Sequence, residues 1–95
     1  MTTDNRQLIS REHILKQLKI ILEPWIYDND MAEKIDEQTN LLMDIGVDSV
    51  GILQLVLGIE KEFNISIKDH ELNSDMFSRM GNLIDIIRAK SNETN

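Results

Sequence analysis

Hydrophobic residues recur at three- and four-residue intervals in three stretches of the chain, the spacing of helices that each bury one face. The first stretch predicts a helix that begins after Ser10, because serine is a preferred N-cap, with Glu12 in its first turn. Pro24 cannot continue a regular helix, so we expect the helix to end near Glu23. Its apolar positions are Leu8, Ile14, Leu15, Leu18, Ile21, Leu22 and Trp25.

The second helix is predicted from about Ser49 to Phe63, with Asp48 as its N-cap. Its positions with the spacing of a core face are Ile52, Leu55, Val56, Ile59 and Phe63. We expect Phe63 to be a central core residue, and truncation of a buried phenylalanine to alanine costs about 3–5 kcal/mol.

The remaining pattern predicts a connector and a last helix. Ile65 and Ile67 alternate with polar residues, but no partner strand is visible, so we predict an extended connector. Asp69 can then cap a short helical turn. A last helix is predicted after an N-cap at Ser78, with inward-facing residues Met80, Leu83, Ile84 and Ile87.

The segment from Trp25 to Val47 has only scattered apolar residues, and a loop of this length is usually functional or partly helical. The fold class is therefore all-α, a small four-helix bundle of three principal helices and one short helix with a long first loop. Ninety-five residues form a single domain, 1–95, in which 1–6 and 91–95 are expected to be flexible tails.

Composition and charge narrow the classes of function. The chain has no cysteine, so it has no disulfide or thiolate metal site, and thiol chemistry would have to arrive on a prosthetic group. A net charge of −7 argues against nucleic acid as a partner. The acidity is consistent either with steering toward basic partner enzymes or with ordinary solubility. No apolar run is long enough for a membrane span, and residues 1–6 lack a signal-like apolar region, so we expect a cytoplasmic location.

The most informative chemistry lies in residues 44–50, which place the Ser49 hydroxyl at the start of a helix. Gly46 allows a sharp turn before the helix, and Asp48 can accept hydrogen bonds from backbone N–H groups of the first turn. A phosphate attached to Ser49 would lie at the positive end of the helix dipole. The arrangement suits a phosphoserine-type linkage.

The run Gly46-Val47-Asp48-Ser49-Val50 resembles the Gly-x-Asp-Ser-Leu motif of acyl carrier proteins. The similarity covers roughly residues 14–90 and continues through Glu60-Lys61-Glu62-Phe63, Ile65, Ile67, Asp69, Leu72, Phe77 and Leu83-Ile84-Asp85-Ile86-Ile87. The resemblance implies that Ser49 carries 4'-phosphopantetheine derived from coenzyme A, and that acyl groups are bound as thioesters to the thiol of this arm. It also implies that the chain is not an enzyme.

The implied partners are a phosphopantetheinyl transferase and acyl-loading ligase, synthase or acyltransferase enzymes, serving a specialised fatty-acid, lipid or polyketide-type pathway. The chain is expected to be a monomer. Two alternatives stay open, an aminoacyl or peptidyl carrier and an unmodified helical interaction module. In the second alternative Ser49 is only the first residue of a helix.

The side of the second helix turned away from its core stripe is expected to contact partner enzymes through Val50, Gln54, Leu57 and Lys61. Leu53 lies on the same side, where neighbouring loops could cover it instead. Familiar fatty-acid carriers are strongly acidic on this face, whereas here Gly51 and Gln54 stand at positions where acids are common. We therefore expect a specialised carrier.

An aliphatic bundle can open to admit an alkyl chain more readily than an aromatic core can. The candidate residues for such an acyl pocket are Ile52, Leu55, Ile59, Phe63, Met80 and Leu83. Their structural role as core residues is the simpler interpretation.

Two rival sites are disfavoured by the sequence. A hydrolytic site built from Ser49 with His13 or His70 lacks the Gly-x-Ser-x-Gly turn, because Val47 occupies the required glycine position. An EF-hand starting at Asp28 would need glycine where Glu33 stands and glutamate where Thr39 stands. We therefore expect no metal site.

Overall fold

The computed structural model describes residues 9–93, and every regular element in that range is helical. The prediction of an all-α chain with three principal helices is confirmed, although the structure has two short helices, α2 and α4. In chain order the elements are α1 (Arg11–Ile21), the 3₁₀ turn η2 (Glu23–Trp25), α2 (Asn29–Lys34), the π-helical turn η3 (Leu41–Ile45), α3 (Ser49–Phe63), the 3₁₀ turn η4 (Asp69–Glu71), α4 (Ser74–Ser78) and α5 (Met80–Glu93).

The start of α1 follows the prediction. The Ser10 hydroxyl accepts a hydrogen bond from the His13 backbone N–H at 3.0 Å, which caps the helix. The helix ends at Ile21, two residues before the predicted end, because the chain tightens there into η2, which contains Pro24. Leu8, predicted as the first apolar position, lies outside the described residues.

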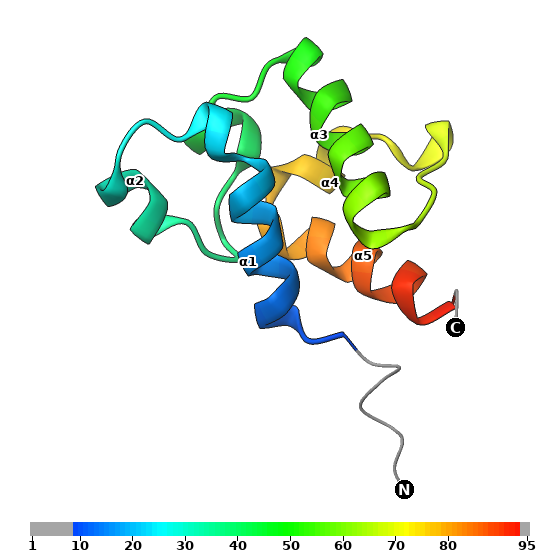
Figure 1. The fold of residues 1–95 in the computed structure, drawn as a ribbon. Helices are drawn as coiled ribbons and strands as arrows, with labels where there is room; N and C mark the ends of the chain where they lie inside the picture. The colour runs from blue at the N-terminus through cyan, green and yellow to red at the C-terminus, as the bar shows by residue number, and fades with distance from the viewer. Residues whose placement is uncertain (1–8, 94–95) are drawn as a thin grey trace, which may run out of the picture.

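Helix α1 packs against both α3 and α5, while α4 lies against α5 and η3 (Figure 1). Short α2 lies at the edge of the molecule (Figure 1). The interior is aliphatic, and burial of such side chains is the main stabilising contribution to the fold. The residues with no exposed surface are Ile14, Leu18, Leu22, Leu41, Leu55, Ile59, Met80, Leu83, Ile84 and Ile87.

Helix α5 buries the four predicted residues, but its predicted N-cap is wrong. Ser78 is the last residue of α4, a separate helix capped by Asn73, whose Oδ1 accepts a hydrogen bond from the Met76 N–H at 3.0 Å. The Met80 and Gly81 N–H groups of α5 instead donate to backbone carbonyls of the first loop, at 2.8 Å each. A cap supplied by a distant loop leaves no signature in the local sequence.

The chain termini are described only in part. Helix α5 continues to Glu93, so residues 91–93 of the predicted tail 91–95 are helical. The predicted tail 1–6 and residues 94–95 lie outside the described residues.

Phe63 is only partly buried, in contrast to the predicted central core position. The reason is its place at the last residue of α3, where Asn64 adopts a left-handed conformation with φ 55° and turns the chain away. The extended connector predicted through Ile65 and Ile67 is present, and both residues are buried. The Glu60 carboxylate accepts a hydrogen bond from the Ile67 N–H at 2.8 Å and ties this connector to α3.

The first loop is fastened to two principal helices by Arg11. Its guanidinium donates to the Glu37 carboxylate at 2.6 and 3.0 Å and to the Asp85 carboxylate of α5. The hydrogen bonds from Arg11 hold the pKa of Glu37 below its ordinary value. Because the Glu37 carbonyl also caps Gly81, the loop that leads to η3 has a defined position.

Candidate functional site

Ser49 is the first residue of the 15-residue helix α3, and its side chain belongs to the exposed surface. The preceding Asp48 is the N-cap, as predicted, and its Oδ1 accepts a hydrogen bond from the Gly51 N–H at 2.8 Å. Within residues 9–93 no hydrogen bond or ion pair engages the Ser49 hydroxyl. The oxygen is therefore open to a modifying enzyme.

The turn before this helix is closed by a reciprocal pair of caps. The Asn40 side-chain oxygen accepts hydrogen bonds from the Leu42 and Met43 N–H groups at 2.9 and 2.8 Å. In return, the Asp44 carboxylate accepts from the Asn40 N–H at 2.8 Å. Because the two side chains satisfy the free N–H groups of η3, this turn is rigidly held.

The link between η3 and α3 is equally constrained. Gly46 has φ 87°, a left-handed conformation that favours glycine, and it ends η3. The N–H groups of Gly46 and Val47 both donate to the Leu41 carbonyl at 3.1 Å. Val47 is buried with 2% of its surface exposed, and it anchors the link in the core. The backbone beside Ser49 is thus fixed on its N-terminal side.

Gly51 lies inside the protein, so its predicted place on the outward face is wrong. A Cβ atom at this position would lie 2.8 Å from Val47 Cγ1 and 3.0 Å from Trp25 Cζ2. Because Gly51 has no side chain, the first turn of α3 can pack directly against Trp25. The lack of an acid at this position follows from packing and carries no information about charge on the surface.

The outward face of α3 is apolar over two turns. Val50, Leu53 and Leu57 expose 64, 60 and 66% of their surface, and their spacing places them on one side of the helix. Gln54 and Lys61 are also exposed. All four residues predicted to contact partners are therefore exposed on the helix that Ser49 begins, and Leu53 is not covered by a loop.

The six residues predicted to line an acyl pocket belong to one hydrophobic core. Leu55, Ile59, Met80 and Leu83 have no exposed surface, whereas Ile52 and Phe63 are partly buried. An alkyl chain could reach the four enclosed residues only if helices moved apart, since protein interiors are closely packed.

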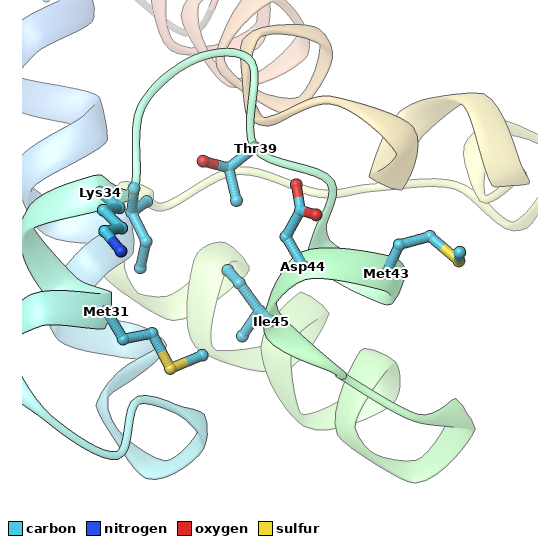
Figure 2. Close-up of a pocket in the computed structure, with 7 residues that line it drawn as sticks. Met31, Lys34, Thr39, Met43, Asp44 and Ile45 are labelled. Carbon is cyan, nitrogen blue, oxygen red and sulfur yellow. The ribbon is translucent and has the colours of Figure 1, made fainter.

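A pocket that the sequence did not predict lies between α2 and η3 (Figure 2). Its volume is about 400 Å³, and its lining residues are Met31, Lys34, Ile35, Thr39, Met43, Asp44 and Ile45. The four-residue spacing of Met31 and Ile35 was the available signal, but the surrounding segment has no sustained periodicity.

The rival sites are not assembled within the part of the chain that the structure describes. His13 in α1 and His70 in η4 are both exposed, and neither is hydrogen-bonded to Ser49. The loop acids serve separate structural contacts, since Asp28 accepts from the Met31 N–H at 2.8 Å and Glu37 pairs with Arg11. Among residues 9–93 no group of three or more such side chains is arranged to hold a metal ion.

Residues 29–86 match the model of the family described as the phosphopantetheine attachment site, and this segment contains η3, α3 and Ser49. The acyl carrier protein of Buchnera aphidicola is 30% identical over 77 residues, which cover 81% of this chain and 94% of that protein. This chain belongs to the acyl carrier protein family.

Two further acyl carrier proteins are similar to the chain. The protein of Thermotoga maritima is 28% identical over 83 residues, covering 87% of this chain and 98% of that protein. The protein of Clostridium acetobutylicum is 31% identical over 62 residues, covering 65 and 78% of the two chains. An attachment site of this family implies a 4'-phosphopantetheine prosthetic group, and acyl carrier proteins are non-catalytic carriers.

A carrier of this kind requires a phosphopantetheinyl transferase and enzymes that load the arm. The exposed Ser49 hydroxyl, the fixed turn before it and the helix N-terminus beside it fit a covalently attached phosphate. In the described part of this chain, no helix is both long and apolar enough to cross a membrane.

Proposed function

We propose that Ser49 Oγ is the attachment atom for 4'-phosphopantetheine, and that the chain shuttles acyl groups as thioesters between partner enzymes. One observation carries this proposal. The Ser49 hydroxyl is exposed and has no hydrogen-bond partner within residues 9–93. It lies at the capped start of α3, the longest helix of the described residues, and inside the segment that the family model matches. A transferase could reach this oxygen without unfolding any part of the core.

The local structure suits a linkage of this type. A phosphate on Ser49 lies at the N-terminus of α3, where the helix dipole favours negative charge. Asp48 holds the first turn through Gly51, so the anchor is rigid. When bound, the group supplies a thiol, which this cysteine-free chain otherwise lacks. Tethering the cargo to a fixed anchor raises its local concentration near an engaged enzyme.

Intact mass tests the attachment directly. Coexpression with a broad-specificity phosphopantetheinyl transferase should add the mass of one arm to the wild type and none to Ser49→Ala. Ser66→Ala, which removes another exposed hydroxyl, should accept the arm as the wild type does. Helical circular dichroism checks that each variant is folded. Modification of Ser49→Ala would contradict the proposal.

We further propose that Val50, Gln54, Leu57 and Lys61 form the surface that visiting enzymes contact. The support is the exposed apolar surface formed by Val50, Leu53 and Leu57, because a contiguous apolar patch on the surface of a protein marks an interaction site. Leu57→Glu should slow arm transfer while the fold is retained. Ile20→Glu changes an equally apolar residue, 51% exposed on α1, and should leave the rate unchanged.

The pathway proposed is a specialised fatty-acid, lipid or polyketide-type one. This proposal was based on the reduced acidity of the outward face of α3. Because Gly51 is buried, only two residues still support it: Gln54, and Lys61 between Glu60 and Glu62. A reconstituted fatty-acid synthase tests this proposal, because a specialised carrier should not replace the housekeeping carrier with matched kinetics. The acyl species bound to protein isolated from its native cell would identify the cargo, and an aminoacyl group there would favour the peptidyl-carrier alternative.

For long saturated cargo we retain the core residues as the proposed lining. These are Ile52, Leu55, Ile59, Phe63, Met80 and Leu83, and α3 and α5 would have to separate to admit the chain. NMR shifts along a series of increasing acyl lengths test this proposal. An absence of shifts away from Ser49 at every length would contradict it.

A further inference from the structure

We propose that the pocket between α2 and η3 binds a short aliphatic acyl group carried on the arm of this same chain. The inference rests on the proposed attachment at Ser49 and adds a binding place for the cargo. It differs from the core residues considered above, because this pocket is already open in the structure.

The pocket surface is mainly apolar. Ile35 and Ile45 expose only 4 and 5% of their surface and are held in the core, whereas Met31 is partly buried. Figure 2 shows the side chains of Met31 and Ile45 extending toward each other from α2 and η3. Methionine is flexible and polarisable, so Met31 can adjust to acyl groups of different shape. The lining therefore suits methylene groups.

The polar side chains on the wall are already used by the loop itself. The Thr39 hydroxyl accepts a hydrogen bond from the Asp36 N–H at 2.9 Å. The Asp44 carboxylate accepts from the Asn40 N–H at 2.8 Å. Lys34 is exposed, so its ammonium group can remain in water. Since Thr39 and Asp44 have partners and Lys34 stays in water, an aliphatic guest leaves no newly unpaired polar atom there, which favours it over a polar one.

The arm is long enough to reach this pocket. Ile45 precedes Ser49 by four residues, so their Cα atoms can be no more than about 14 Å apart. From Ser49 Oγ to the thiol sulfur the arm contains about 14 single-chain bonds, which span roughly 16 Å when extended at the per-bond advance of a polypeptide. The thioester can therefore be delivered to the pocket mouth without any movement of α3.

The size of the pocket limits the cargo. A volume of about 400 Å³ falls at the small end of the range for ligand pockets. Entry of a short acyl group would not require closely packed helices to separate, unlike entry into the core. The limited volume therefore favours short cargo at this site.

Methyl NMR tests the proposal on the arm-bearing protein. Spectra are compared between the form with a free thiol and the form loaded with a hexanoyl group. The largest acyl-dependent shifts should occur at the methyl groups of Met31, Ile35 and Ile45. Shifts confined to Ile59 and Leu83 in the core, or no shifts beyond Ser49, would overturn it.

Two variants test whether the shifts depend on the pocket lining. Met31→Glu places a charge in the apolar lining and should abolish the hexanoyl-dependent shifts at Ile35 and Ile45. Ile20→Glu is the matched control on α1 and should preserve them. If Met31→Glu does not fold by circular dichroism, Met31→Ala replaces it, and the shifts at Ile45 should then fall to less than half. Unchanged shifts in the folded Met31 variant would overturn the proposal.

Intact mass distinguishes a failure of the attachment at Ser49 from a failure of the pocket proposal. An unmodified wild type would overturn the attachment at Ser49 and the pocket proposal together. A wild type that carries both arm and hexanoyl group, but shows no shifts at the pocket, would overturn the pocket proposal alone.

Discussion

The Asp48 carboxylate accepts a hydrogen bond from the Gly51 backbone N–H at 2.8 Å, and Ser49 lies between these two residues. The contact closes the first turn of α3 from the side of the chain that precedes Ser49. It leaves the serine hydroxyl exposed while the backbone on both sides is held. Stability at this site and access to it are therefore provided by different residues.

Removal of the cap should weaken the fold measurably. We expect Asp48→Ala to lower the free energy of unfolding by about 1 kcal/mol, because the Gly51 N–H loses its partner. Urea denaturation measures this change. Asp48→Asn keeps an accepting oxygen and should lose much less. Equal losses in the two variants would show that charge, and not the hydrogen bond, is the source of stabilisation.

Gly51→Ala should be destabilising even though alanine favours helices. A new Cβ atom would crowd Val47 and Trp25, and such overpacking typically costs about 1–3 kcal/mol, against about 1 kcal/mol gained in helix propensity. The loss should appear in urea unfolding, together with a change in the fluorescence of Trp25, the single tryptophan of the sequence.

Gly58→Ala in the same helix provides the control for this substitution. Its Cβ atom would meet one close neighbour, Ile21 Cγ2 at 3.1 Å, which is a side-chain methyl group. This variant should therefore be more stable than Gly51→Ala. The reverse order would contradict the packing of Trp25 on α3.

The ion pair between Arg11 and Glu37 should make stability depend on pH. Hydrogen bonds from Arg11 lower the pKa of Glu37 in the folded state, so this carboxylate stabilises the fold above its unfolded pKa of about 4.3. That contribution is lost as the pH falls through the lower, folded-state pKa. Glu37→Gln should be less stable than the wild type at pH 7, and the difference should shrink at pH 3.

Urea unfolding at pH 7, 5 and 3 measures this difference. Glu33→Gln is the control, because Glu33 is an exposed acid of α2 and the change in net charge is the same. Because Glu33 is not part of the ion pair, the stability difference for Glu33→Gln should change less between pH 7 and pH 3 than that for Glu37→Gln. A constant difference for Glu37→Gln would contradict a stabilising role for the ion pair.

Burial predicts an order of stability within α3. Leu55→Ala removes a side chain with no exposed surface and should cost about 2–5 kcal/mol. Phe63 is partly exposed, so Phe63→Ala should cost less than the 3–5 kcal/mol typical of a fully buried phenylalanine, about 2 kcal/mol. Chemical denaturation of both variants checks this order. A greater loss for Phe63→Ala would support its predicted role as a central core residue.

The sequence was most informative where a local signal controls a local structure. Asp48 and Ser10 were identified as caps because an N-cap needs only a short side chain and the N–H groups that follow it. The bounds of α3 and the inward face of α5 followed from periodicity. The Ser49 motif was visible for the same reason, since its residues are contiguous.

The errors occurred where distant segments meet. Gly51 was assigned to the surface because helical spacing does not reveal that Trp25 lies against it. The N-terminus of α5 was misplaced because its caps are the Thr39 and Glu37 carbonyls from the first loop. The pocket between α2 and η3 was missed because its residues have no common period along the chain.

By itself the sequence determined the all-helical class, the three principal helices and a serine at a helix start, since helix formation and capping act over a few residues. Tertiary structure alone decided which positions are enclosed, which backbone groups cap α5, and where the surface opens into a pocket. These properties depend on packing between segments far apart in the chain, and side-chain patterning specifies only that such packing must occur.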